Sequence, residues 1–163
     1  MPLDQIANIA EISAAALVVV TLIYLAIQIK QNTDTLKLST AHNTAEDFSV
    51  TYILLAERGD IADIIFRGLQ NLEALEPVER LRFYCFYHKF FRTFENAHYQ
   101  FMRGALEAEP FEGMSQQLVT LKTQPGVQTY WQDRKNWYTK TFQEYIDNEI
   151  LPTEVKGFKL AGT

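Results

Sequence analysis

The sequence is poor in the residues that build disulfide scaffolds, phosphate-binding loops and nucleic-acid surfaces. It has one cysteine, Cys85, so an intramolecular disulfide is excluded. Because Cys85 lies among aromatic residues, we expect a small buried side chain in a reducing compartment. The chain has no glycine-rich loop to hold a phosphate and no basic run to neutralise a nucleic-acid backbone. With a formal net charge of -5, it is not expected to bind nucleic acid.

Glycine and proline are also scarce, and neither occurs between Pro2 and Gly59. Nothing in the backbone therefore obliges a helix to stop in this stretch. We predict a continuous or slightly kinked helix, and a break is most favourable in the sequence QNTD at 31–34, whose polar residues can cap a new helix. No segment alternates between apolar and polar residues for long enough to form a strand. The predicted fold class is all-α.

What the first part of the chain does contain is a long uncharged run, from Ile12 to Ile29, bracketed by Glu11 and Lys30. As a helix this run is about 27 Å long, close to the hydrocarbon thickness of a bilayer. A cleaved signal peptide is disfavoured, because acidic residues precede the run and no small-x-small site follows it. A buried core helix of a soluble domain is the other alternative. We favour a membrane anchor, since apolar residues occupy every face of the run.

The flanking charges predict the orientation and the division of the chain. Lys30 and Lys37 follow the run, whereas Asp4 and Glu11 precede it, so we expect the N-terminus outside and the rest of the chain in the cytoplasm. We predict a leader and transmembrane helix at 1–30, a stalk helix at 31–58 and a cytoplasmic α-helical domain at 59–163. An apolar seam is expected along the stalk, formed by Leu38, Ala41, Ala45, Phe48, Tyr52 and Leu55.

Polar residues of the same long helix recur at three-four spacing and form a candidate oligomer or pore face, made of Thr21, Gln28, Asn32 and Thr35. Polar groups within a membrane span tend to face protein or water. The stripe could therefore be a contact between copies of the chain, or the lining of a pore in a ring of copies. The third interpretation is that these residues bond to their own helix or lie in water beyond the span.

The segment 59–163 is predicted to form a helical bundle. Apolar spacing predicts a short helix after Gly59 and a long helix that starts at Glu76 and Pro77 and ends near Gly104. A shorter helix closed by Pro125 and Gly126 follows, and the last helix is predicted over 127–150. The central helix carries an aromatic stripe of Phe83, Tyr87, Phe90, Phe94, Ala97 and Phe101. The last helix is expected to bury Val127, Trp131, Tyr138, Phe142, Tyr145 and Ile146.

The best polar cluster is a stripe of the central helix that includes His88, Glu95 and His98. Glu95 and His98 have the Glu-x-x-His spacing of di-iron carboxylate bundles, but that site needs a second such pair and two further glutamates. We favour an ordinary hydrogen-bond network, and we expect no metal, no cofactor and no enzymatic activity. A metalloenzyme built on Glu95 and His98 is a weaker alternative. Cys85 and His88 alone do not make a nucleophilic site.

Three blocks of sequence carry a family resemblance: TLIYLAIQIKQNT at 21–33, FFRTFENAHYQF at 90–101 and PGVQTYWQDRKNWYTKTFQEYID at 125–147. Together they resemble an uncharacterised family of small bacterial membrane-anchored proteins. The resemblance implies a bacterial origin, one N-terminal membrane helix and a helical domain. With the predicted anchor and cytoplasmic domain, we expect the bacterial inner membrane as the location. The resemblance brings no catalytic residue or cofactor with it. The family more often has tyrosine where His98 stands, which speaks against a general role for this histidine.

Together these features predict a membrane-anchored helical protein that acts through protein contacts. Its expected partners are the lipid bilayer and either further copies of itself or another membrane protein, to which it would be an accessory subunit. The alternative is a homo-oligomeric channel lined by Thr21, Gln28, Asn32 and Thr35.

Overall fold

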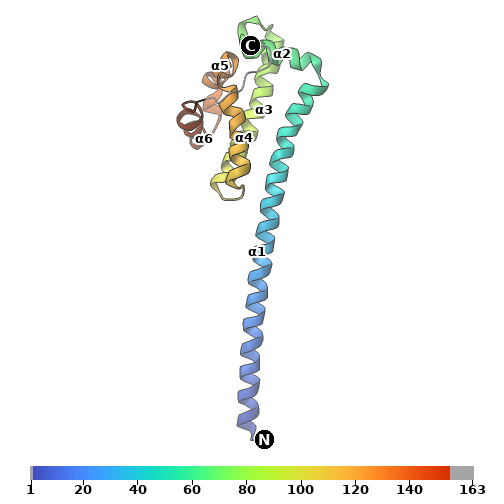
Figure 1. Ribbon diagram of the computed structural model, residues 1–163, viewed down its shortest axis with the longest axis vertical. Helices are drawn as coiled ribbons and strands as arrows, with labels where there is room; N and C mark the ends of the chain where they lie inside the picture. The colour runs from blue at the N-terminus through green and yellow to red at the C-terminus, as the bar shows by residue number, and fades with distance from the viewer. Residues whose placement is uncertain (1, 155–163) are drawn as a thin grey trace. The chain divides into compact units, whose positions relative to one another are not determined.

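The computed structural model describes residues 2–154, and within this range it is all-α, without a strand. Helix α1 runs from Leu3 to Glu57 without a break (Figure 1). The contacts divide the chain into two compact units, with the boundary between Ser39 and Thr40. The segment 31–58, predicted as a stalk, is therefore shared: α1 belongs to the first unit up to Ser39 and to the second unit from Thr40 onward.

The first unit is the apolar part of α1. Every side chain from Ile12 to Ile29 is exposed, including Leu17 at 68% and Ile29 at 66%. This helix is long and apolar enough to cross a membrane, by length and composition. A helix that is apolar on all faces is stable only if lipid or protein covers it, and nothing within the unit does so.

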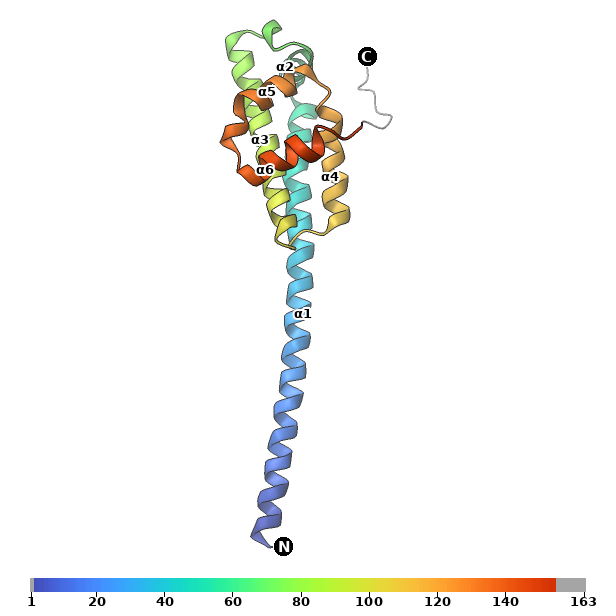
Figure 2. The same ribbon diagram turned by 90° about the vertical axis from the view of Figure 1, so that its left-hand side faces the viewer.

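The second unit contains the end of α1 and five more α-helices. These are α2 (Gly59–Gln70), α3 (Pro77–Met102), α4 (Ala108–Leu121), α5 (Pro125–Arg134) and α6 (Lys140–Tyr145). Short 3₁₀ turns follow α2 at Leu72–Ala74 and α5 at Lys135–Trp137, and a π-helical turn at Ile146–Ile150 extends α6. Helices α3 and α4 run alongside the last part of α1, while α5 and α6 cross one face of them (Figure 2).

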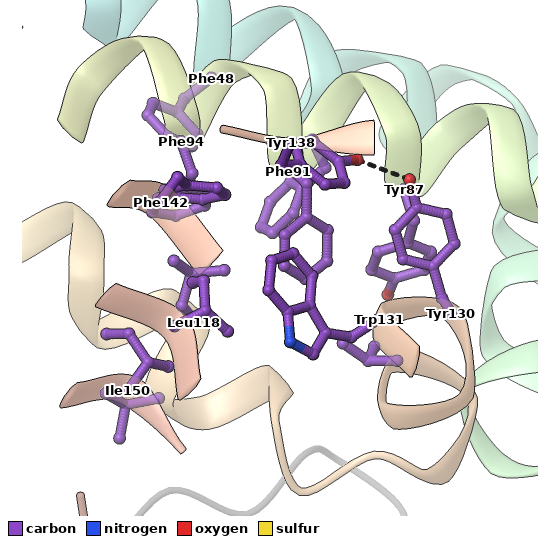
Figure 3. Packing of buried hydrophobic residues seen from close by; sticks show 14 of the residues in the cluster. Phe48, Tyr87, Phe91, Phe94, Leu118, Tyr130, Trp131, Tyr138, Phe142 and Ile150 are labelled. Carbon is purple, nitrogen blue, oxygen red and sulfur yellow. Dashed lines mark hydrogen bonds between the residues drawn. The ribbon is translucent and has the colours of Figure 1, made fainter. Parts of the chain in front are cut away.

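Helix α3 is the centre of the bundle, and its predicted ends are confirmed. Glu76 and Glu79 form a capping box around Pro77, and the chain leaves the helix through Gly104, whose φ of 70° is costly for other residues. The predicted aromatic stripe is buried as far as Ala97, with Phe101 at its edge. Figure 3 shows its neighbour Phe91 beside Trp131 and Tyr138, and the ring centroids of Phe91 and Trp131 are 5.2 Å apart.

Two glycines allow α2 and α5 to cross in close contact. A Cβ atom on Gly126 would lie 1.9 Å from the carbonyl oxygen of Gly68, and one on Gly68 would lie 2.4 Å from the ring of Phe83. Neither position can accept a side chain without moving a helix or a core ring. The two glycines therefore fix how closely α5 approaches α2, with α3 beneath.

Three expectations about individual segments are wrong. The α1 seam is right at Ala41, Phe48 and Leu55, which contact the core, and wrong at Leu38, Ala45 and Tyr52, which are exposed. The pattern favoured Ala45 and Tyr52 because they are more apolar, but the bundle covers Thr44 and Thr51 beside them, and both threonines are buried. Phe48 stays buried, and its ring meets Phe94 edge-on at 4.6 Å.

The predicted last helix is broken at Lys135–Trp137, and only its apolar residues behave as expected, since all six are buried. The break is held by hydrogen bonds from Arg92 and Glu95 of α3, and a local sequence pattern cannot reveal bonds between such distant residues. Cys85 is exposed rather than buried. It lies between Phe83 and Tyr87 in sequence, and those two residues turn toward the core, so Cys85 points away from it.

Candidate functional site

The polar stripe of the first unit is satisfied largely within its own helix. The hydroxyl of Thr21 donates to the carbonyl oxygen of Leu17 at 2.8 Å, and that of Thr35 donates to Gln31 at 2.9 Å. The side-chain amide of Gln28 donates to the hydroxyl of Tyr24 at 2.7 Å. All of these residues and Asn32 are exposed on the helix. The hydroxyls of Thr21 and Thr35 therefore do not require water or a second helix as a partner.

In the second unit, the structure brings the polar stripe of α3 to the start of α6. Glu95 is only 8% exposed, and its carboxylate accepts a hydrogen bond from the backbone N–H of Thr139 at 2.7 Å. Arg92 donates to the other carboxylate oxygen and also to the carbonyl oxygen of Trp137, at 2.8 Å. Arg92 and Glu95 of α3 thus hold the turn between α5 and α6 at the carbonyl of Trp137 and at the N–H of Thr139.

The two histidines of this stripe lie among aromatic rings. His98 is buried and stacks on Tyr145, with ring centroids 4.5 Å apart. Burial lowers its pKa, and Glu149 and Glu95 only partly offset this effect. The His88 ring lies edge-on to Trp137, and its Nδ1 is 3.4 Å from the hydroxyl of Tyr138. Burial lowers the pKa of His88 as well, and Arg92 adds to the decrease.

Together these contacts form a tether between α3 and the start of α6. The carboxylate oxygens of Glu95 accept hydrogen bonds from the backbone N–H of Thr139 and from the Arg92 guanidinium, and the His98 ring stacks on Tyr145. Across residues 2–154, no three His, Cys, Asp or Glu side chains are close enough to hold a metal ion. The spacing of Glu95 and His98, which suggested a di-iron pair, is used for packing and capping.

The outer side of α1 in the second unit carries an exposed apolar surface. We name Val50, Ile53 and Leu54 the α1 apolar face; their exposed fractions are 50%, 51% and 41%. This face borders a groove of about 640 Å³ that Phe86 and Cys85 of α3 also line. Charged residues of both signs stand on the rim of the groove, with Glu57 on α1 and Lys89 on α3.

A second hollow, of about 390 Å³, lies between α1, α2, α3 and α4. Thr51, Tyr87 and Gln117 are among its lining residues, and Thr51 lines both hollows. Neither hollow was foreseen from the sequence, because each needs side chains from three or four helices. The sequence does indicate the α1 apolar face, since Val50, Ile53 and Leu54 follow three-four spacing beside the predicted seam.

Comparison of the chain with protein-family models, curated proteins and solved structures found no match.

Proposed function

We propose that this protein is a single-pass membrane protein whose second unit associates with a second copy of the chain, and that it acts through this assembly and not through catalysis. The observation that carries the proposal is the α1 apolar face. Val50, Ile53 and Leu54 follow one another on one face of the helix, and grouped exposed apolar side chains of this kind are typical of protein interaction sites. Here about half of each side chain is exposed, on a helix whose opposite side packs into the core.

Self-association is favoured over an unrelated partner by the charges around the groove. Glu57 and Lys89 lie on its rim, together with Arg58 and Arg82, which both contact Asp60. A surface that carries both signs can pair with a copy of itself about a two-fold axis, with acidic residues of one copy facing basic residues of the other. Anchoring in one membrane would also raise the effective concentration of the copies.

The membrane part of the proposal rests on the exposed apolar length of α1, from Ile12 to Ile29. Lys30 and Lys37 follow this length, and Asp4 and Glu11 precede it, so we place the N-terminus outside and the second unit in the cytoplasm. We infer the bacterial inner membrane as the location, from the bacterial origin that the resemblance implies and from the proposed orientation.

The orientation can be tested with the native cysteine. Cys85 is the one cysteine of the chain and is exposed. A membrane-impermeant maleimide should label it in inverted vesicles and leave it unlabelled in right-side-out vesicles. Labelling in right-side-out vesicles only would reverse the orientation, and recovery of the full chain in the soluble fraction without detergent would exclude the anchor.

The assembly can be tested with the same residue, since Cys85 lines the groove. In native membranes, a short bismaleimide should cross-link two copies of the wild-type chain. Ile53→Glu should reduce this product by about tenfold or more, because it places a charge in the apolar contact. The matched control is Phe66→Glu on α2, because Phe66 is as exposed as Ile53 but lines neither hollow.

Each result of the cross-linking experiment has a defined meaning. Equal cross-linking in the two glutamate variants would reject the α1 apolar face as the contact. A monomeric mass for the wild-type chain, with a second protein bound in a fixed ratio that Ile53→Glu abolishes, would replace self-association by an accessory-subunit role.

A further inference from the structure

The cavity between α1, α2, α3 and α4 has the properties of a ligand site beside the proposed assembly surface, and Thr51 and Phe86 line both hollows. Its volume of about 390 Å³ lies in the usual range for small-molecule pockets. The hollow is partly open to solvent, and Tyr52 and Gln116 among its lining residues are exposed. Its walls are mainly apolar, so a ligand that covers them gains by removing apolar surface from water.

The walls define what kind of molecule can fill it. Leu55, Ile65, Leu69 and Phe90 supply aliphatic and aromatic surface, and none of the lining residues carries a charge. A charged ligand group would lose its hydration without gaining a partner, so the ligand is uncharged. An apolar cavity of about 150 Å³ holds benzene in another protein, so the volume here corresponds to roughly 15 non-hydrogen atoms.

Hydroxyl groups at the cavity give the ligand a polar end. Thr51 is 3% exposed, and its Oγ1 has no hydrogen-bond partner among the residues that the structure describes. This is unusual within the chain, because the helical threonines Thr44, Thr93 and Thr120 all lie within hydrogen-bond distance of the carbonyl four residues earlier. A buried hydroxyl without a partner is costly, and a ligand oxygen would remove that cost.

Tyr87 supplies a second hydroxyl. Its ring is buried in the aromatic stripe of α3, and the residue lines the cavity. Burial raises its pKa, and the neighbouring Tyr52 hydroxyl raises it further, so Tyr87 stays protonated and able to donate. The hydroxyls of Tyr130 and Tyr138 are hydrogen-bonded to each other at 2.7 Å, which is the dashed line in Figure 3.

The mouth of the cavity is formed by α1 and α4. Tyr52 and Gln116 are exposed, and the hydroxyl of Tyr52 donates to the side-chain oxygen of Gln117, which joins the two helices at this point. A ligand that enters here passes polar but uncharged groups before it reaches the apolar wall.

We propose that this cavity binds an uncharged, mainly aliphatic molecule with one hydroxyl or carbonyl group, and that Thr51 and Tyr87 form hydrogen bonds to that group. A medium-chain alcohol has the required size and polarity. The corresponding carboxylate is disfavoured because no basic residue lines the cavity, and the corresponding alkane leaves the hydroxyl of Thr51 without a partner.

The test uses the full chain in phospholipid nanodiscs with two photoreactive probes, dodecanol and dodecane, each with a diazirine in mid-chain. Peptide mapping should place dodecanol labels on the cavity residues of α1 and α3, and unlabelled dodecanol should compete better than dodecanoate. Thr51→Val should lower dodecanol labelling by about 3- to 10-fold, the value of one hydrogen bond, and leave dodecane labelling unchanged. Labels in the apolar run at 12–29 report the probe concentration in the bilayer.

Two further variants complete the test. Thr51→Val keeps the shape of the side chain and removes an unpartnered hydroxyl, so its thermal midpoint should not fall, and Tyr87→Phe should reduce dodecanol labelling in the same way. Thr129→Val is the matched control, because the Thr129 hydroxyl already bonds to the carbonyl of Pro125, outside the cavity. Cavity labels that dodecanol does not compete, or that are equal in the wild type, Thr51→Val and Tyr87→Phe, would overturn the proposal.

Discussion

The Glu95 carboxylate of α3 accepts a hydrogen bond from the backbone N–H of Thr139, 44 residues further along the chain, at 2.7 Å. Thr139 is the residue that precedes α6, and the N–H groups at a helix start have no partner within the helix. A capping group usually comes from the same segment. Here it comes from the central helix, so the start of α6 depends on α3.

We predict that removal of this tether destabilises the second unit. Glu95→Ala leaves a buried N–H and Arg92 without their partner, and we expect the free energy of unfolding to fall by about 2–4 kcal/mol. Glu95→Gln retains an oxygen that can accept from Thr139, so its loss should be about half as large. Urea unfolding of the full chain in detergent, followed by tryptophan fluorescence, measures both. Equal stability of wild type and Glu95→Ala would mean that the contact contributes nothing.

The crossing of α2 and α5 leads to a second prediction. Gly126→Ala would place a methyl group 1.9 Å from the Gly68 carbonyl oxygen, so α5 must move away from α2. We expect a loss of about 3 kcal/mol in thermal or urea unfolding. Gly113→Ala is the control, because a Cβ atom there meets nothing within 4 Å and Gly113 lies inside α4. This control should gain up to about 1 kcal/mol, and a similar effect of the two substitutions would contradict the close crossing.

Stability should decrease in mild acid because of His98. Its pKa is lowered in the folded protein by burial, from an ordinary value of 6.5. Below that pH the unfolded chain binds a proton more readily than the folded chain, so the free energy of unfolding falls as the pH drops from 6.5 through the lower folded pKa. His98→Phe keeps a ring beside Tyr145 and should reduce the slope between about pH 7 and pH 5, and His88, whose pKa is also lowered by burial, should account for a slope that remains. An unchanged slope in the variant would assign the pH dependence to other groups.

The polar stripe of the first unit should not form an ion-conducting pore. Thr21 and Gln28 bond to Leu17 and Tyr24 of the same helix. We therefore expect the double variant Thr21→Val and Gln28→Leu to insert into liposomes like the wild type, and both proteins to leave the ion permeability at that of protein-free liposomes. Wild-type ion flux that the double variant abolishes would instead support the channel alternative.

The sequence allowed the helices to be predicted where local pattern decides them. The start of α3 at Pro77, its end near Gly104 and the burial of its aromatic stripe all follow from caps and from three-four spacing. The break before α6 could not be predicted in this way. The residues at 127–150 have a continuous helical pattern, and the break is held by Arg92 and Glu95, which are distant in sequence.

The candidate sites were less accessible to sequence reasoning for the same reason. The polar residues of α3 were found, but their roles depend on what α5 and α6 place opposite them. The cavity beside Thr51 combines four helices, and threonine at a buried seam position gives no signal of an unpartnered hydroxyl. Exposure of Cys85 depends on which face of α3 the bundle leaves open.

The burial of Phe48 decides where the chain can be cut. This ring belongs to α1 but packs on Phe90 and Phe94, and the Thr44 hydroxyl lies 2.9 Å from the side-chain oxygen of Gln100. Proteolysis after Lys30 or Lys37 removes the apolar run and leaves every core ring in place, whereas a shortened chain that begins after Phe48 loses one of them. A water-soluble fragment for crystallisation should therefore begin at Thr40, where the second unit begins.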